Sequence, residues 1–390
     1  MRVAVLGAGY AGLTLARKLE RNLPDDADVL VVERTGRHLV QHELHRVVRR
    51  PSLADDIAVD LDDVLDRAEV REAEVADVDP DAGTFTLSSG ERVDYDYCAV
   101  CLGAETAFYD LPGVEEHAAP LKTLDHAERI RADFLDALEA GQAGENENSS
   151  ARVVVGGAGL SGVQVAGELA AFAREEGARD AVTITLLEQF DSVAPSFPEN
   201  FQSAVRDQLE ARDVEVRTRT AVAAADEEAV ELGSGERLAY DQFVWTGGIR
   251  GPDALDGERP EVNNTMRLGD GTFVVGDAAR VVDADGEPVP ASAQAAVREA
   301  RAVADSIARL VEYDREGGGV FEPRPDRFAF DSPGWLVSVG DGAVAQVGPT
   351  VLTGRAARAL KTTVGAGYLS SVGAIRNAAD LVSEELGYER

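Results

Sequence analysis

The stretch RVAVLGAGYAGLTLARKL at Arg2–Leu19 decides the fold, because the chain repeats its pattern as RVVVGGAGLSGVQVAGELA at Arg152–Ala170. In both stretches a short apolar run passes through Gly-x-Gly-x-x-Gly into an Ala- and Leu-rich helical pattern. This succession predicts a strand, a tight turn and a helix, the opening half of a dinucleotide-binding βαβ unit. An offset of 150 residues aligns three pairs of glycines: Gly7 with Gly157, Gly9 with Gly159, and Gly12 with Gly162.

Each glycine of the motif has its own physical role. The first permits the turn, the second lets the backbone approach a pyrophosphate, and the third lets helix and strand pack closely. The N-terminus of the following helix then faces the phosphate charge. We therefore expect two dinucleotide sites in one chain; the alternative is a pair of βαβ folds that bind no nucleotide.

An acidic residue ends the apolar run that follows each motif. Glu33 stands in VLVVERT, 21 residues after Gly12, and Glu188 stands in ITLLEQF, 26 residues after Gly162. A carboxylate in this place accepts hydrogen bonds from the hydroxyls of an adenosine ribose. Because it also repels a 2′-phosphate, and no arginine directly follows Glu188, we expect the second site to prefer NAD(H) to NADP(H).

The composition is strongly acidic. Asp and Glu number 71 against 38 Lys and Arg, which gives a formal net charge of −33, and the lysines are Lys18, Lys122 and Lys361. Such a surface suits a cytoplasm at molar salt, where the Debye length is roughly 3 Å and self-repulsion is screened. We interpret the chain as halophilic, with an ordinary acidic protein as the alternative. The same surface repels nucleic-acid phosphates, so no nucleic-acid partner is expected.

Several residue types indicate what the chain does not use. Met1 leads directly into an apolar strand pattern and no apolar run approaches roughly 18 residues, so we expect a cytoplasmic protein without a membrane span. Cys98 and Cys101 stand three apart in a strand-like run and are expected to be buried structural thiols rather than a redox pair. The histidines lack metal-ligand spacing, so no metal site is expected. We interpret His42 and His45 as packing or solvated residues, with a proton relay as the alternative.

The chain resembles the flavoprotein oxidoreductases with two dinucleotide-binding domains, and among them it is most similar to the type II NADH dehydrogenases. The resemblance covers nearly the whole chain. Besides the two glycine motifs and the ITLLE run, it rests on HLVQHEL at His38–Leu44, CLGAET at Cys101–Thr106, DLPGVEEHAAPLKTLDHAERIR at Asp110–Arg131, VWTGG at Val244–Gly248, GDAA at Gly276–Ala279 and PASAQAA at Pro290–Ala296.

This resemblance implies an α/β fold with two Rossmann-like domains and a small C-terminal module. An FAD-binding domain is expected to combine residues 1–112 and 236–320, with an NAD(H)-binding domain at 113–235 inserted between them. The C-terminal module is expected at 321–390. The chain would cross between the two domains at the strand ends that carry Gly103 and Gly247.

The implied activity is that of an FAD-dependent NADH dehydrogenase, which moves a hydride from NADH to FAD and then electrons to a quinone without pumping ions. In such proteins a Gly-Asp pair after a strand returns to the first domain, so Asp277 is expected to complete the FAD site; an ordinary strand-ending turn is the alternative. The expected cofactor-binding residues are Gly7, Gly9, Tyr10, Ala11, Gly12, Glu33, Arg34, Gly103, Ala104, Asp277, Gln294, Ala295, Gly157, Gly159, Leu160, Ser161, Gly162, Glu188, Gly247 and Gly248.

The candidate catalytic residues are Gln164, Gln294 and Lys361. The helix pattern that begins at Pro290 is expected to aim amides near Gln294, Ala295 and Ala296 at the flavin, where the helix N-terminus stabilises negative charge; a plain surface helix is the alternative. Two departures from the family bear on quinone reduction. Arg298 and Glu299 replace two glutamines, and Gln164 stands where many relatives carry a glutamate.

The acceptor and the C-terminal segment leave alternatives open. A soluble acceptor, such as a ferredoxin-like protein, oxygen or a small molecule, is one alternative to a quinone, and a flavin-based redox sensor is another. Relatives use their C-terminal region to lie on a membrane or to form a homodimer. We expect peripheral binding at the cytoplasmic face of the membrane, with Arg355, Arg358 and Lys361 toward lipid, or packing against the FAD domain or a second subunit. Lys361 near the flavin is a further alternative.

Overall fold

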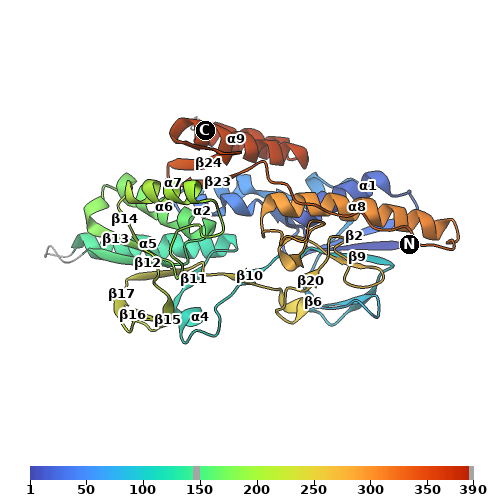
Figure 1. Cartoon of the computed structure of the whole chain (residues 1–390), viewed down its shortest axis with the longest axis horizontal. Coiled ribbons are helices and arrows are strands. Elements are labelled where there is room, and N and C mark those ends of the chain that lie inside the picture. The colour runs from blue at the N-terminus through green and yellow to red at the C-terminus, as the bar shows by residue number, and fades with distance from the viewer. Residues whose placement is uncertain (144–149, 386–390) are drawn as a thin grey trace.

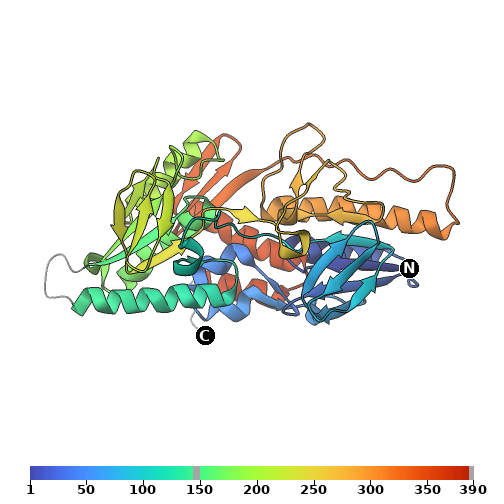
Figure 2. The same cartoon turned by 90° about the horizontal axis from the view of Figure 1, so that it is seen from below.

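The computed structural model describes residues 1–143 and 150–385. The chain forms two units, each built on a five-stranded parallel sheet, and a C-terminal segment that lies across both (Figure 1). The predicted α/β class and the doubled Rossmann-like unit are therefore confirmed. Figure 2 shows the two units side by side along the long axis of the molecule.

The first unit carries a sheet of order β21-β9-β1-β2-β5, which has α1 and α8 packed against each other beside it. Its central strands are continuous apolar runs with buried side chains, as expected of parallel strands covered on both faces. The sheet consists of β1 (Arg2–Leu6), β2 (Asp28–Glu33), β5 (Glu69–Glu72), β9 (Tyr97–Val100) and β21 (Thr272–Val274), and the two helices are α1 (Tyr10–Asn22) and α8 (Ala293–Arg315).

Smaller elements complete this unit. An antiparallel sheet is formed by β6 (Val75–Asp79), β7 (Thr84–Leu87) and β8 (Arg92–Asp94), and a two-stranded pair by β3 (Arg37–Leu39) and β4 (Ala58–Asp60). The segment between them holds η1 (Gln41–Glu43), α2 (Leu44–Val47) and α3 (Leu53–Ile57), and η2 (Leu61–Asp63) follows β4. The returning chain adds η4 (Asp253–Leu255), β20 (Glu261–Val262), η5 (Gly276–Ala278) and β22 (Arg280–Val281).

The second unit repeats the plan of the first. Its sheet has the order β11-β18-β12-β13-β14, so the strand after the glycine motif again lies in the middle, and a three-stranded antiparallel sheet again accompanies it. The parallel strands are β11 (Ala119–Pro120), β12 (Ala151–Gly156), β13 (Val182–Leu187), β14 (Val214–Arg217) and β18 (Gln242–Trp245); the antiparallel ones are β15 (Val222–Ala225), β16 (Ala229–Leu232) and β17 (Arg237–Ala239). The helices are α4 (Val114–His117), α5 (Leu124–Ala143), η3 (Arg179–Ala181), α6 (Leu160–Glu175) and α7 (Glu199–Glu210).

The chain crosses between the units through two short strands that pair with each other. β10 (Glu105–Thr106) leaves the first unit and β19 (Ile249–Arg250) leaves the second, and they form an antiparallel pair. The expected domain boundary at residue 236 differs from this arrangement. β18 pairs in parallel with β12, because its apolar residues fill the second sheet, so the return to the first unit begins only after Trp245.

The C-terminal segment folds as an antiparallel sheet followed by two helices (Figure 1). β23 (Gly334–Val339), β24 (Gly342–Val347) and β25 (Thr350–Thr353) lead into α9 (Gly354–Ser371) and α10 (Ile375–Glu385). Its sheet packs closely on the second unit, since a Cβ on Gly167 of α6 would lie 2.6 Å from the Gly340 nitrogen. Among the described residues, no helix has the length and apolarity needed to cross a membrane.

Candidate cofactor sites

The first glycine turn joins β1 to α1. Gly7 has a φ of +89°, a conformation that favours glycine, and a Cβ on Gly12 would lie 1.8 Å from the Gly7 carbonyl oxygen. A Cβ on Gly9, in contrast, would meet no protein atom within 4 Å. The first and third glycines are thus required by the fold, whereas the second keeps one side of the turn open for a ligand.

The second turn, between β12 and α6, has the same geometry. Gly157 has a φ of +93°, and a Cβ on Gly162 would lie 1.9 Å from the Gly157 carbonyl oxygen. A Cβ on Gly159 would again meet nothing within 4 Å. Both turns therefore offer an open backbone at the N-terminus of a long helix, the arrangement that binds phosphate. Leu160 and Ser161 form the first residues of that helix, as Tyr10 and Ala11 do in the first unit.

The two predicted ribose-binding carboxylates lie over these turns. A Glu33 oxygen accepts a hydrogen bond from the Ala8 nitrogen at 2.7 Å, and a Glu188 oxygen accepts one from the Ala158 nitrogen at 2.9 Å. Glu188 also accepts from the Phe190 nitrogen at 3.0 Å. Each carboxylate is thus held beside the residue between the first two glycines, as a ribose contact requires. Arg34 lies beside Glu33 with an exposed side chain that reaches toward Glu74.

The predicted crossing glycines adjoin the two turns. A Cβ on Gly157 would lie 2.6 Å from the Gly247 Cα, so the second crossing runs against the second turn. Gly103 has a φ of +71° and follows Cys101, whose carbonyl oxygen would lie 2.5 Å from a Cβ on Gly7. The Ala107 nitrogen, just beyond the first crossing, donates to the Gly248 oxygen at 3.1 Å. The two turns are therefore connected through short backbone segments that contact each other and form a hydrogen bond.

Asp277 lies on η5, directly after β21, and adjoins the first glycine turn. Gly276 has a φ of +72°, and a Cβ there would lie 3.3 Å from side chains of both α1 and α8. Burial raises the pKa of the half-buried Asp277 carboxyl, and the cationic side chains of Lys122 and Arg259 oppose this shift. The structure thus brings Asp277 to the first unit's turn, 265 residues away from Gly12 in sequence.

A narrow hollow lies beside Asp277 at the start of α8. Its lining comes from three segments that are separate in sequence: Arg259; Gly276, Asp277, Ala279 and Val281; and Val289, Pro290, Ala291, Ser292, Ala295, Ala296 and Glu299. The helix that the sequence places beside the flavin therefore lies next to Asp277.

The amides at the start of α8 make hydrogen bonds within the protein, and their expected position beside a flavin stays a prediction. The Ser292 hydroxyl caps the helix by accepting from the Ala295 nitrogen at 3.3 Å, and the Ser292 carbonyl accepts from the Ala296 nitrogen at 3.0 Å. The Gln294 side chain donates to the Ser332 hydroxyl at 2.9 Å. These two amides thus already have acceptors, and Gln294 contacts the segment that leads to the C-terminal sheet.

Residues 1–300 match the pyridine nucleotide-disulphide oxidoreductase family. The chain belongs to this family. A curated relative, the type II NADH:quinone oxidoreductase of Staphylococcus aureus (strain NCTC 8325 / PS 47), is 26% identical over 398 aligned residues that cover 96% of each chain. NDH2 from Plasmodium falciparum, solved in complex with NADH, superposes with a TM-score of 0.83 at 16% identity, covering 99% of this chain and 98% of that one.

A second solved structure shares the fold of this pyridine nucleotide-disulphide oxidoreductase. The sulfide:quinone oxidoreductase of Aquifex aeolicus superposes with a TM-score of 0.78 at 20% identity, covering 99% of this chain and 93% of that one. The cysteines of the present chain carry no disulphide, because Cys98 and Cys101 are both free and buried. Burial raises the pKa of both thiols, so they stay protonated at neutral pH. The expectation of buried structural thiols is confirmed.

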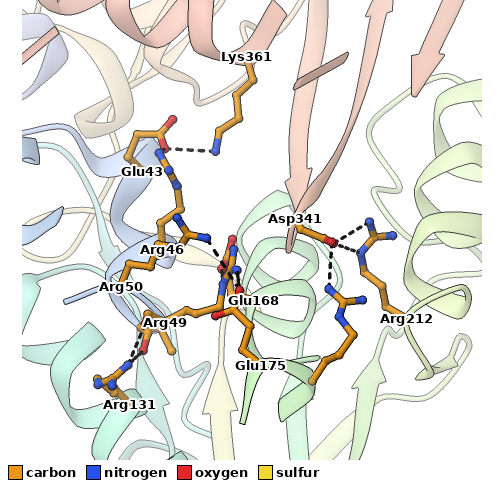
Figure 3. A network of polar contacts seen from close by, with 12 residues as sticks. Glu43, Arg46, Arg49, Arg50, Arg131, Glu168, Glu175, Arg212, Asp341 and Lys361 are labelled. Carbon is orange, nitrogen blue, oxygen red and sulfur yellow. Dashed lines mark hydrogen bonds and ion pairs between the residues drawn. The ribbon is translucent and has the colours of Figure 1, made fainter. Parts of the chain in front are cut away.

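A buried ion pair that the sequence analysis missed joins the two units of this oxidoreductase (Figure 3). The Arg49 Nε lies 2.6 Å from a Glu168 oxygen, and these side chains are 5% and 1% exposed. Arg49 follows α2 in the first unit, whereas Glu168 belongs to α6 in the second. Arg131 of α5 donates to the Arg49 carbonyl oxygen at 2.9 Å, and Glu175 also pairs with Arg49. The sequence signal for this pair was Glu168, the charged residue in the otherwise apolar pattern VAGELA.

The C-terminal segment is held to both units by further ion pairs (Figure 3). Asp341, in the turn between β23 and β24, pairs with Arg174 at 3.0 Å and with Arg212 at 3.1 Å, both from the second unit. Lys361 of α9 pairs with Glu43 of the first unit at 3.2 Å. The segment thus packs against the rest of its own chain.

Lys361 does not face lipid, and that expectation is wrong. Its side chain is only 9% exposed, because α9 directs it inward toward the buried Glu43. Burial alone would raise the pKa of the Glu43 carboxyl, but the neighbouring charges of Lys361, Arg46 and His42 hold this pKa below its ordinary value. Arg355 and Arg358 on the same helix are exposed. Gln164 lies half-buried near the start of α6.

His38 and His42 lie against Tyr10 at the start of α1. His38 is fully buried, with its Nδ1 2.8 Å from the Ala8 carbonyl oxygen and its Nε2 3.1 Å from the Tyr368 hydroxyl of α9. The Tyr10 hydroxyl forms a hydrogen bond with His42 Nδ1, and His45 is 2% exposed. Burial lowers the pKa of His38 to about 4, so its ring is neutral and packs against Tyr368.

Proposed function

We propose that this chain is an FAD-dependent NADH dehydrogenase that moves a hydride from NADH to FAD and then electrons to a quinone, without pumping ions. The observation that carries the proposal is the doubled glycine turn, each copy with an open second glycine and a carboxylate held beside it. The curated relatives over 96% of the chain are named as type II NADH:quinone oxidoreductases. Their name supports NADH as donor and a quinone as acceptor.

The residues fit FAD at the first turn. A Cβ on Gly9 would occupy open space where the backbone must approach a pyrophosphate, and Glu33 lies over the same turn for a ribose. Asp277 reaches this turn and not the second, because Gly276 packs between α1 and α8. Gly7, Gly9, Gly12, Glu33 and Asp277 would hold FAD, which when bound supplies the group that accepts the hydride.

NADH fits the second turn, where Gly157, Gly159, Gly162 and Glu188 would hold it. The two turns are linked through the β10–β19 pair and the hydrogen bond from the Ala107 nitrogen to the Gly248 oxygen. Such a rigid link lets the protein orient two cofactors against each other, which is the main contribution it makes to hydride transfer. The proposed FAD domain comprises residues 1–112 and 246–320, and the NAD(H) domain residues 113–245.

For the C-terminal module we propose peripheral association with the cytoplasmic face of the membrane. Val364 and Ile375 are 54% and 71% exposed, and Arg355 and Arg358 are exposed on the same segment. Apolar side chains with neighbouring arginines suit an interface with anionic lipid. A homodimer that covers these apolar residues is the second candidate arrangement.

Stopped-flow spectroscopy of the flavin-loaded protein at molar salt tests the function. NADH is expected to bleach the flavin, and menaquinone or ubiquinone analogues are expected to restore its colour within the time of a catalytic turnover. If only a ferredoxin-like protein, oxygen or a dye restores the flavin colour, the acceptor is a soluble one and the quinone assignment is rejected. A flavin that NADH bleaches and no acceptor restores would indicate a redox sensor. Protein that binds neither FAD nor NADH would overturn the proposal.

Glu188 is expected to set the choice between NADH and NADPH. A 2′-phosphate would approach this carboxylate, so the wild-type kcat/KM for NADH should exceed that for NADPH by at least about tenfold, or about 1.4 kcal/mol. Glu188→Gln keeps an acceptor for the Ala158 nitrogen and removes the charge. It should therefore lower the ratio of kcat/KM for NADH to kcat/KM for NADPH. Glu210→Gln, an exposed carboxylate on α7, serves as the control. Equal kcat/KM for both cofactors in the wild type would contradict this role.

A further inference from the structure

Glu299 is a buried carboxyl group beside Gly276, which adjoins the proposed FAD turn. It is 2% exposed, and one of its oxygens accepts a hydrogen bond from the Gly276 nitrogen at 2.7 Å. Gly276 precedes Asp277, so this carboxyl supports the backbone beside Asp277, one of the residues that would hold FAD.

The charged and titratable groups near Glu299 come from several elements. Asp277 on η5 and Cys101 after β9 face it, together with Arg259 from the segment before β20. The Arg259 guanidinium donates to the Asp277 and Ala279 carbonyl oxygens at 2.7 Å and 2.8 Å, so it is held against the backbone. The charge of Lys122 also acts on Asp277, where it opposes the rise in the pKa of that carboxyl. The cluster thus contains two carboxyls near one another, with cations engaged nearby.

Burial raises the pKa of Glu299 to about 7, with the Gly276 N–H and Arg259 opposing the shift and Asp277 adding to it. Glu299 also lines the hollow at the start of α8 together with Asp277 and Ser292. The group is therefore able to change its charge at neutral pH beside the proposed FAD site.

We propose that Glu299 takes up a proton when the flavin is reduced, and so couples the flavin's reduction potential to pH. This inference rests on the proposed function. NADH gives up a hydride, two electrons and one proton, and becomes NAD⁺, while the flavin site gains the hydride and one negative charge. The Glu299 carboxylate then takes one proton from water, which restores the charge of the site. Reoxidation by the acceptor releases that proton.

The sign of the effect follows from the charges. With oxidised flavin, Glu299 is ionised above pH 7; the negative charge of reduced flavin raises its pKa further. Below about pH 6 the carboxyl is protonated in both states, so it contributes nothing to the pH dependence. Just above pH 7, reduction takes up this proton in addition to the one carried by the hydride. The slope of the potential against pH should there be up to about twice that of a site without Glu299, because the slope follows the protons taken up per electron pair.

The test is a spectroscopic redox titration of the flavin-loaded wild type and of Glu299→Gln from pH 5.5 to 9. The amide of the variant keeps an acceptor for the Gly276 nitrogen and cannot titrate, so a merely supporting role leaves the potentials unchanged. The expected result is a steeper wild-type slope above pH 7, with the variant at the higher potential there and both potentials equal near pH 5.5. Glu312→Gln, an exposed carboxylate on α8, should follow the wild type.

A second measurement detects the carboxyl group itself in the same two proteins. The infrared difference spectrum of reduced minus oxidised wild type at pH 8 should gain a protonated-carboxyl band that is absent in Glu299→Gln. Equal slopes of potential against pH in wild type and variant, or the same infrared band in both, would overturn the inference. If NADH still bleaches the flavin in that case, the proposed function stands. A wild type that retains no flavin would overturn both.

Discussion

Alanine in place of Gly159 is expected to weaken NADH binding about 10- to 100-fold, which corresponds to about 1–3 kcal/mol of steric strain. The new Cβ would meet no protein atom within 4 Å, so the fold should be unaffected. It would instead occupy the open side of the turn, where the backbone must approach the pyrophosphate. The Kd for NADH is measured by titration with a fluorescence signal that does not come from the flavin, and the FAD content is measured in the same samples. The Kd checks the expected loss of NADH affinity, and the FAD content checks that the fold is unaffected.

Gly9→Ala is the matched control, because its Cβ would also meet nothing within 4 Å but lies at the other turn. It should lower FAD retention and leave the NADH affinity of the protein unchanged. The two variants therefore separate the cofactor assignments of the two turns. If Gly159→Ala lost FAD and Gly9→Ala lost NADH affinity, the assignments would have to be exchanged. Unchanged binding in both variants would show that neither turn holds a dinucleotide.

Replacement of Arg49 by methionine is expected to lower the free energy of unfolding by about 3–5 kcal/mol, the cost of leaving a buried charge unpaired. Glu168 is 1% exposed and would lose its buried partner at 2.6 Å. This pair joins the segment after α2 of the first unit to α6 of the second. Without it, the two units should unfold at different urea concentrations. Urea denaturation at fixed salt, followed by both far-ultraviolet circular dichroism and flavin fluorescence, measures the effect.

The double variant Arg49→Met with Glu168→Met should recover most of that loss, because two apolar side chains can replace a buried ion pair. Arg179→Ala, which breaks an exposed pair with Asp213, should change stability by about 1 kcal/mol or less. A single Arg49 variant as stable as Arg179→Ala would show that the buried pair does not link the units. A double variant as unstable as the single one would assign the loss to packing instead of charge.

Local sequence pattern was sufficient for the two turns. Gly7, Gly12, Gly157 and Gly162 take their places because a positive φ and close packing of helix on strand exclude a side chain. The placement of Glu33 and Glu188 follows from strand length, since each stands at the end of the next parallel strand. These features depend on neighbours within about thirty residues. The residue-by-residue roles in holding cofactors stay predictions that the variants above test.

The C-terminal segment shows where pattern reasoning failed. The spacing of Lys361 with Arg355 and Arg358 suggested a cationic face toward lipid, but the buried Glu43 draws Lys361 inward. The domain boundary at 236 also fell one strand early, because an apolar strand such as β18 does not reveal in sequence which of two similar sheets it joins. The expectation that the Ala295 amide faces a flavin stays a prediction, and its nitrogen also donates to the Ser292 hydroxyl.

By itself the sequence determined that the chain contains two copies of one nucleotide-binding unit, since glycine spacing and strand periodicity act through short-range sterics. Only the tertiary structure decided which charges are buried together. Arg49 meets Glu168, Lys361 meets Glu43, and Glu299 lies under Gly276. The physical reason is that such partners come from different structural elements whose packing fixes both their distance and their desolvation, and neither quantity is encoded in the residues next to them.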